Sequence, residues 1–373
     1  FFTRVSTKVK HVYRNYLLPA AVFQGVIIGG GYATGREIIE FITINGPLGG
    51  LISCLTIALG FAIVLSLSFA FAKTFGTSNY RTFLTSLLGK GWVLYEILFI
   101  LLLVLIIAIV SAAATDTAKS ALSLPESYSF VIIFTLIVGC NYFGKILIQN
   151  LLAAWTFLLM ISLLFYTVAC LTQLDAGSFT DKSLYTNTID SVSSGFKFAV
   201  YNSALVPVLI YCTTQIEGKK AAFKAGIFAG IMGAVPALLL HLAFVTRYPE
   251  VIEQGVPTFW LLRNSDFSQF EPLYLIILFG TIILTAVGLL HGVNERINGW
   301  LGEYNRHELG KKSQAAISAT LVLISVLFSK IGIISLVAKG YGWIAWGFFF
   351  AFTLPLLIIG TSKLIKRSFL DAS

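Results

Sequence analysis

Charged residues are scarce in this chain of 373 residues. Asp, Glu, Lys and Arg together make up only 12%, against about 25% in an ordinary globular protein. Hydrophobic residues make up 57%, and the mean hydropathy is +0.86. A soluble fold of this size has too few polar side chains to cover so much apolar surface. The composition therefore excludes the soluble classes and indicates an integral membrane protein.

Cysteine and histidine are also rare. The four cysteines lie apart in apolar segments, without the paired spacing of a metal or redox site, at Cys54, Cys140, Cys170 and Cys212. His241 and His291 lack metal-ligand spacing, and no nucleophile–base set is apparent. We therefore expect neither an enzyme nor a resident cofactor.

Ten apolar segments are long enough, or nearly so, to cross a bilayer as helices, which takes about 20 residues. They lie at 16–45, 47–72, 92–115, 127–144, 146–173, 196–216, 222–247, 272–294, 313–329 and 340–362. Short helices are expected between them at Asn79–Leu88 and Val256–Arg263, and at Ile331–Ala338 as a connection outside the bilayer. The predicted fold class is an all-α membrane protein of ten transmembrane helices.

Positive charge is distributed unevenly about these ten spans. An even number of spans places both termini on one side, and most of the 26 Lys and Arg residues lie on that side. The positive-inside rule therefore predicts that both termini are cytoplasmic, and the expected location is the inner (cytoplasmic) membrane. Topology explains the net charge of +9, so the expected partner is the lipid bilayer and not nucleic acid.

The polar connection Leu174–Gly195 divides the chain into two sets of five spans, 1–175 and 190–365. Because five is odd, the second set enters the membrane from the side opposite to the first. This arithmetic predicts a 5+5 inverted repeat within one integral membrane domain.

The first helix of each set carries a predicted break. Four glycines between Gly29 and Gly35 disfavour a continuous helix in a segment longer than one crossing requires. Gly31 and Gly35 also have the spacing of closely packed helices, but the adjacent glycines and the length favour a break. In the sixth span, Pro207 and the polar residues before it predict a break over Tyr201–Pro207. Gly226 and Gly230 in the seventh span are expected only to pack closely.

At these residues the chain resembles the amino acid–polyamine–organocation (APC) superfamily, which shares the leucine-transporter (LeuT) fold, and within it the YkvI-like branch of bacterial membrane proteins. The resemblance covers nearly the whole chain and rests on Gly29–Glu37, Tyr201-Asn202, Thr285–Gly288 and Ala338–Tyr341. It implies a secondary transporter with its substrate between the two broken helices. Gly342 stands where relatives often have proline.

Substrate binding is expected at the two breaks. The free carbonyls near Ile28–Gly30 suit a cation, and the N–H groups around Thr34–Glu37 suit an anion. The predicted substrate-binding residues are Gly29, Gly30, Gly31, Tyr32, Ala33, Thr34, Gly35, Glu37, Tyr201, Asn202 and Ser203.

Three ionisable residues within the first span are functional candidates, because charge inside a membrane is expensive. Arg36 and Glu40 are spaced to form an i, i+4 pair. They are predicted to act as a gate, and the alternative is a purely structural pair. Glu37 lies next to the break and is predicted to serve as a gate, as a partner for a cationic substrate group or as a titrating carboxylate.

The resemblance also implies a possible sodium site between the first and eighth spans, formed by Ile28, Thr281 and Thr285. The alternative for these threonines is a hydrogen bond to their own helix, and Leu284 stands where relatives often have a second hydroxyl. Proton-coupled relatives carry a lysine within the fifth span, whereas Lys145 lies at the end of that span.

The predicted function is secondary active transport of a small organic solute, an amino acid or a related amine, by alternating access. Cation-coupled symport is expected, with Na⁺ ahead of H⁺, in a monomer or homodimer. The alternative is a transporter-like solute sensor or receptor subunit that binds its solute and signals without transport.

Overall fold

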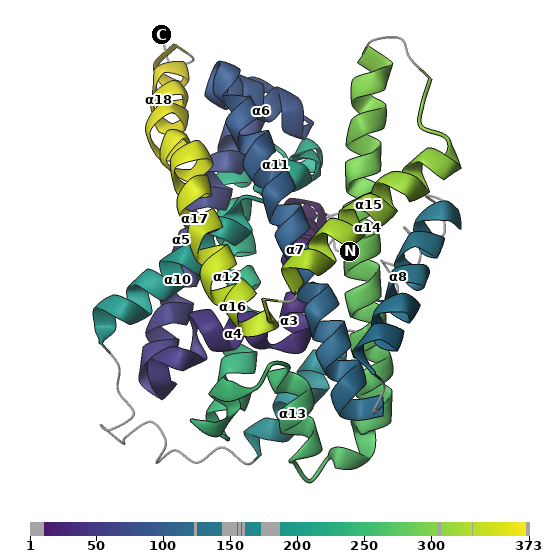
Figure 1. Ribbon diagram of the computed structural model, residues 1–373. Helices are drawn as coiled ribbons and strands as arrows, with labels where there is room; N and C mark the ends of the chain where they lie inside the picture. Colours follow the sequence, from purple (N-terminus) through teal and green to yellow (C-terminus); the bar gives the residue numbers. More distant parts are fainter. Residues whose placement is uncertain are drawn as a thin grey trace, which may run out of the picture.

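The computed structural model describes residues 11–122, 125–143, 155, 158, 161–172, 187–303, 307–329 and 331–370. Across these residues the secondary structure is helical and contains no strand (Figure 1). By length and composition, five of the described helices are long and apolar enough to cross a membrane. A sixth span results if the bent pair Thr188–Ser203 and Val206–Gln215 crosses as one. The chain is an all-α membrane protein, as predicted.

The elements before the long polar connection follow the predicted spans closely. In chain order they are η1 (Tyr13–Leu17), α2 (Leu18–Ile27), α3 (Gly30–Thr34), α4 (Arg36–Phe41), η2 (Thr43–Asn45), α5 (Gly46–Phe75), α6 (Tyr80–Leu88), η3 (Gly89–Gly91), α7 (Trp92–Leu122) and α8 (Glu126–Phe143). The short helix expected at Asn79–Leu88 is confirmed as α6. Most of the predicted fifth span, 146–173, and Lys145 lie outside the described residues.

The remaining elements begin at Thr188. In chain order they are α10 (Thr188–Ser203), α11 (Val206–Leu209), η6 (Ile210–Gln215), α12 (Lys219–Val245), η7 (Glu250–Glu253), α13 (Pro257–Arg263), η8 (Ser268–Phe270), α14 (Glu271–Glu303), α15 (Lys311–Ser329), α16 (Ile333–Ser335), η9 (Leu336–Tyr341), α17 (Gly342–Phe348), η10 (Phe349–Thr353), η11 (Leu356–Gly360) and α18 (Thr361–Leu370). The short helix expected at Val256–Arg263 is confirmed as α13.

One expectation about the last span is wrong. Ile331–Ala338 is not a separate connecting helix, because residues 333–370 form one continuous helix from α16 to α18. Gly332, with a positive φ of 89°, provides the turn before it. Gly340 lies close against Leu105 of α7, so this part of the helix packs on its neighbour instead of leaving the helix bundle.

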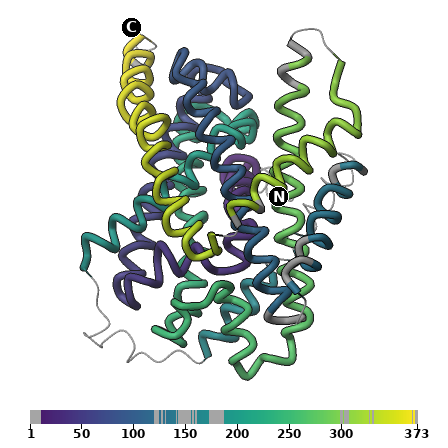
Figure 2. The backbone as a smooth tube through the Cα atoms, viewed as in Figure 1, coloured from purple at the N-terminus to yellow at the C-terminus, as the bar shows by residue number. Residues whose placement is uncertain are grey.

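The broken first segment lies among helices from both parts of the chain. Helix α5 packs along α12 and α10, while α2 contacts α12 and α11. Helices α7, α8, α14 and α15 pack on one another beside this group (Figures 1 and 2). This arrangement is the one that two inverted halves would give, although the repeat itself stays a prediction.

Close packing of α12 on α5 depends on two glycines. A Cβ atom at Gly226 would overlap the backbone of Ser66, and one at Gly230 would overlap the backbone of Ala62. The predicted packing role of this glycine pair is therefore confirmed. Beside it, Phe23 of α2 packs edge-on against Phe61 of α5, with ring centroids 5.0 Å apart.

Candidate functional site

The first broken helix breaks in two places instead of unwinding over its whole glycine run. Helix α2 ends at Ile27, and Ile28 and Gly29 adopt extended conformations before α3 begins at Gly30. A second change of direction follows at Gly35, whose φ of 76° is left-handed. A Cβ atom there would also lie 2.5 Å from the Phe244 ring. The predicted break is confirmed, but the helix after it begins at Gly30, so its free N–H groups lie there and not around Thr34–Glu37.

The second broken helix is also interrupted over fewer residues than predicted. Tyr201, Asn202 and Ser203 keep their helical conformation in the last turn of α10. The interruption falls at Ala204 and Leu205, where the axis bends by 42°. Pro207 then lies in the first turn of α11, where its missing N–H leaves no helical bond unmade.

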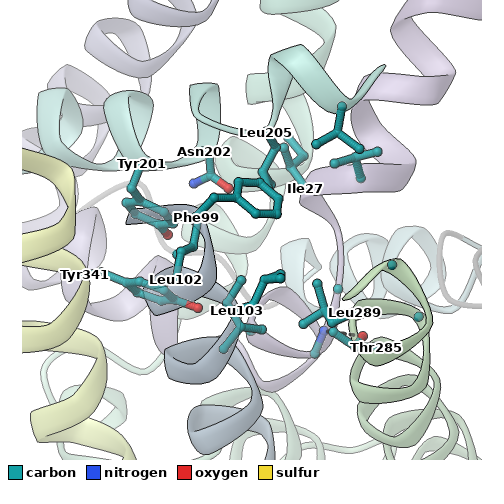
Figure 3. Close-up of a pocket in the computed structure, with 18 of the residues that line it drawn as sticks. Ile27, Phe99, Leu102, Leu103, Tyr201, Asn202, Leu205, Thr285, Leu289 and Tyr341 are labelled. Carbon is teal, nitrogen blue, oxygen red and sulfur yellow. Dashed lines mark hydrogen bonds between the residues drawn. The ribbon is translucent and has the colours of Figure 1, made fainter. Parts of the chain in front are cut away.

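A cavity of about 200 Å³ lies between the two breaks. Figure 3 shows side chains from the broken helices and from α7, α14 and η9 converging on it. Of the predicted substrate-binding residues, those that line it are Gly29, Gly30, Gly31, Glu37, Tyr201 and Asn202. The lining does not include Tyr32, Ala33, Thr34, Gly35 or Ser203.

Glu37 is the central polar group of this cavity. Its side chain is buried, with 5% exposure. The Tyr201 hydroxyl donates to Oε2 at 2.7 Å, and the Tyr341 hydroxyl donates to Oε1 at 3.1 Å. The two tyrosine rings stack in parallel, 4.4 Å apart with an interplanar angle of 6°. A Cβ atom at Gly31 would overlap the carboxylate, so the glycine lets the carboxylate lie against α3.

No cation of the protein neutralises Glu37 within the described part of the chain. The described ion pairs involve other residues, and both oxygens of Glu37 accept neutral hydroxyl groups. A buried carboxylate without a charged partner is costly to maintain. Glu37 therefore presents to the cavity a carboxyl group whose charge, when it is ionised, no described cation of the protein balances.

Arg36 and Glu40 of α4 do not bond to Glu37 or to its two tyrosines; they bond to each other and to the segment around η7. Arg36 Nη2 donates to Glu40 Oε2 at 2.8 Å, which confirms the expected i, i+4 pair. Arg36 Nη1 donates to the carbonyls of Ile252 at 2.6 Å and Gln254 at 3.1 Å. The arginine is only 2% exposed, and it ties α4 to the segment around η7.

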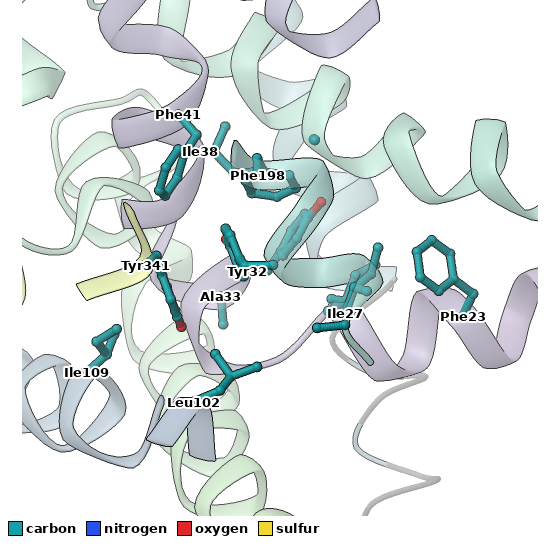
Figure 4. Close-up of a cluster of buried hydrophobic side chains, with 14 of the residues drawn as sticks. Phe23, Ile27, Tyr32, Ala33, Ile38, Phe41, Leu102, Ile109, Phe198 and Tyr341 are labelled. Carbon is teal, nitrogen blue, oxygen red and sulfur yellow. The ribbon is translucent and has the colours of Figure 1, made fainter. Parts of the chain in front are cut away.

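Of the five predicted residues outside the cavity lining, Ala33 contacts α13 and α14, and Tyr32 contacts α10. Thr258 and Tyr274 both donate hydroxyl hydrogen bonds to the Ala33 carbonyl, at 2.6 and 2.8 Å. Tyr32 packs edge-on against Phe198, with ring centroids 6.1 Å apart (Figure 4). These contacts and the Arg36 bonds close the cavity on the side of α13.

Toward α6 a second cavity of about 880 Å³ lies next to the first. The two share lining residues on α7, α11 and α14, which are Leu103, Val208, Gly292 and Arg296. Arg296 pairs with Glu96 at 2.9 Å and lies over the rings of Phe99 and Tyr80, at 4.0 and 4.8 Å from their centroids. The larger cavity reaches the exposed residues Ser78 and Asn79 before α6.

The predicted sodium ligands line a third cavity, of about 270 Å³, next to the end of α2. Its lining includes Ile28, Thr281 and Thr285. The Thr285 hydroxyl accepts the Gly30 N–H at 3.0 Å, while the Thr281 hydroxyl donates to Ile277 of its own helix at 2.7 Å. Because α2 ends at Ile27, its last carbonyls do not accept N–H hydrogen bonds from a following helical turn. Among the described residues, no group of His, Cys, Asp or Glu could hold a metal ion.

Sequence reasoning missed parts of this site. Tyr341 was named only as part of the resemblance and not as a site residue. A tyrosine beside Gly340 in an apolar segment is by itself only a weak indication of a binding site. Arg296 was not singled out, because it lies beyond the apolar part of α14. Its ion pair with Glu96 joins residues 200 positions apart in sequence, so no local pattern points to it.

Comparison with known proteins supports the fold. No known family model matches the chain. The chain is 21% identical over 341 residues to the uncharacterized membrane protein YkvI of Bacillus subtilis (strain 168), covering 88% of this chain and 92% of that protein. The structure of this chain is similar to that of the Eremococcus coleocola manganese transporter. The TM-score is 0.53, and the identity is 13% over 91% of this chain and 77% of the transporter.

A second structural neighbour is a Na⁺-coupled sialic acid symporter in its substrate-bound outward-open state. The TM-score is 0.50 and the identity 12%, over 92% of this chain and 84% of the symporter. Both neighbours are transporters, and both similarities extend over most of the chain. The chain therefore has the helical fold of these transporters, and YkvI is a membrane protein similar to it in sequence.

Proposed function

We propose that the chain is a secondary active transporter that moves a small organic solute carrying an amine, an amino acid or a related amine. The observation that carries this proposal is the Glu37 carboxylate, which is buried in a cavity between two broken helices and is paired with no cation of the described residues. An ammonium group of the solute would supply the missing positive charge through a charge-assisted hydrogen bond. Substrates of transporters built in this way bind at such breaks.

Access to the cavity differs on its two sides, as alternating access requires. Contacts of Ala33 and Arg36 close it toward α13, while a larger cavity continues it toward α6. Under the proposed topology, with cytoplasmic termini in the bacterial inner membrane, α6 is cytoplasmic and this conformation faces inward. Opening toward α13 would have to break the bonds of Arg36, which is the sense in which we propose Arg36 and Glu40 as a gate.

Sodium is the coupling ion that we propose, with H⁺ as the alternative. Terminal carbonyls of α2 and the hydroxyl groups of Thr281 and Thr285 would offer oxygen ligands without adding fixed charge. Thr285 also touches the break directly through Gly30. An ion at this place would therefore couple to the conformation of the broken helix.

Thr285→Val tests the sodium proposal. The variant removes a hydroxyl ligand and leaves the buried Gly30 N–H without its acceptor, which costs about 1–3 kcal/mol. We expect the Na⁺ concentration that gives half-maximal thermal stabilisation to rise about 10-fold, an effect of 1.4 kcal/mol. Thr285→Ser keeps the hydroxyl and should restore most of the response.

Thr135→Val is the matched control, because the Thr135 hydroxyl bonds only to Val131 of its own helix on an exposed face. It should leave the Na⁺ response unchanged. An unaltered Na⁺ response in Thr285→Val, or an equal loss in both valine variants, would contradict the proposed site.

Counterflow in proteoliposomes tests the proposed function itself. Purified protein is reconstituted into vesicles preloaded with an unlabelled amine or amino acid, and uptake of the labelled compound is followed with and without Na⁺. Exchange above that of protein-free vesicles is the expected result. Saturable binding without exchange would support the alternative of a sensor, and the absence of both would reject a solute site. The proposed assembly, a monomer or homodimer in the bilayer, does not affect this assay.

A further inference from the structure

We infer that the substrate is a monoamine with an apolar body and no carboxylate, so that amines are preferred to the amino acids from which they differ by one carboxylate group. The inference rests on the proposed function for the location of the site. Its evidence is the charge, the hydrogen-bond donors and the shape of the cavity between the broken helices.

The charges that line this cavity do not match those of an amino acid. The charged lining residues are Glu37 and Arg296, and Arg296 is neutralised by Glu96 at 2.9 Å. The cavity therefore carries one uncompensated negative charge. A monocation cancels that charge, whereas a zwitterion brings a carboxylate that has no free cation to meet it. Burying such a carboxylate without a partner is unfavourable.

Four donors of the cavity wall are engaged with the protein itself. The hydroxyl groups of Tyr201 and Tyr341 donate to Glu37. The Gly30 N–H donates to Thr285, and the side-chain amide of Asn202 donates to the Phe198 carbonyl at 3.1 Å. A substrate carboxylate would have to displace these bonds. An ammonium donates its own hydrogens, and the remaining lone pairs of the Glu37 carboxylate can accept them.

The rest of the wall is apolar and suits a compact hydrocarbon group. Large side chains face the cavity from α2, α7, α10–α11 and α14 (Figure 3), and they include Ile27, Phe99, Leu102, Leu103, Leu205 and Leu289. An apolar cavity of about 150 Å³ accepts benzene, so about 200 Å³ accommodates a ring or branched alkyl group with a short aminoalkyl chain. A polyamine would leave its second charge among these side chains.

Matched ligand pairs test this inference on the purified full-length protein. The pairs are 2-phenylethylamine with phenylalanine and isoamylamine with leucine, and each pair differs only in the carboxylate. Thermal stabilisation in detergent is measured over a concentration series, since a ligand stabilises the state that it binds. We expect each amine to act at concentrations at least about 10-fold lower than its amino acid.

The neutral alcohol 2-phenylethanol and the diamine putrescine are the controls. Neither should stabilise the protein in the range where 2-phenylethylamine does, because the first lacks the charge and the second lacks the apolar body. Equal or stronger stabilisation by either amino acid, or by either control, would overturn the inference. No stabilisation by either amine would overturn it as well.

Failure of this inference is distinguishable from failure of the proposed function. Counterflow of leucine or phenylalanine without stabilisation by the amines would overturn the amine preference and leave transport standing. Stabilisation by the amines without any counterflow would support the amine site and reject transport.

Discussion

Glu37→Gln is expected to weaken amine binding about 100-fold and to abolish counterflow. Truncating one partner of a buried charge pair costs about 2–5 kcal/mol, and each 1.4 kcal/mol is a factor of 10 in affinity. Glutamine keeps the volume and can still accept a hydrogen bond from Tyr201 or Tyr341, so the unliganded protein should remain folded. Thermal stabilisation by 2-phenylethylamine measures the affinity, and proteoliposome exchange measures transport.

Two variants accompany this measurement. Tyr341→Phe removes one hydroxyl from Oε1 but keeps the stacked ring and the carboxylate, so we expect a loss of only about 10-fold. Glu308→Gln neutralises an exposed carboxylate outside the cavity and should bind normally. If Glu37→Gln bound the amine as tightly as Glu308→Gln does, Glu37 could not be the partner of the ammonium.

Gly226→Ala and Gly230→Ala are each expected to lower the thermal stability of the protein, and by more than Gly139→Ala does. Each new Cβ atom would overlap backbone atoms of α5, and a backbone moves aside only if the two helices separate. Overpacking of this kind costs about 1–3 kcal/mol, and it affects the close contact on which helix association in a membrane depends. The apparent Tm in detergent should fall by several degrees for each variant.

Gly139→Ala is the matched control for the same chemical change. Gly139 lies in α8, and a Cβ atom there would meet no neighbouring atom of the described residues within 4 Å. Alanine is the better helix former by about 1 kcal/mol, so this variant should be neutral or slightly stabilising. Equal behaviour of the three alanine variants would show that the α5–α12 contact does not limit stability.

Much of the site was accessible from local sequence. Gly29, Gly30 and Gly31 predicted the first break, because a run of glycines disfavours a helix wherever it occurs. Glu37 was a candidate because a carboxylate next to a break within an apolar segment has few structural explanations. The pairing of Arg36 with Glu40 followed from their spacing on one turn.

Other parts depended on how distant helices meet. The two tyrosines that bind Glu37 are 140 residues apart in sequence, at positions 201 and 341, and nothing local pairs them. Tyr32 and Ser203 were expected at the cavity because they lie beside the breaks. A glycine run and a proline do not specify which way the side chains of the adjoining helices α3 and α10 point. In the structure Tyr32 and Ser203 are buried away from the cavity, and Tyr32 packs against Phe198.

The sequence by itself determined that this protein is a helical membrane protein, where most of its helices lie and which two of them break. These properties follow from composition and from the backbone preferences of glycine and proline, which act over a few residues. Only the tertiary structure decided which polar groups share the cavity, that Glu37 meets two tyrosines and no cation among the described residues, and that contacts of Ala33 and Arg36 lie toward α13. Such properties depend on contacts between helices far apart in the chain, for which no local preference is sufficient.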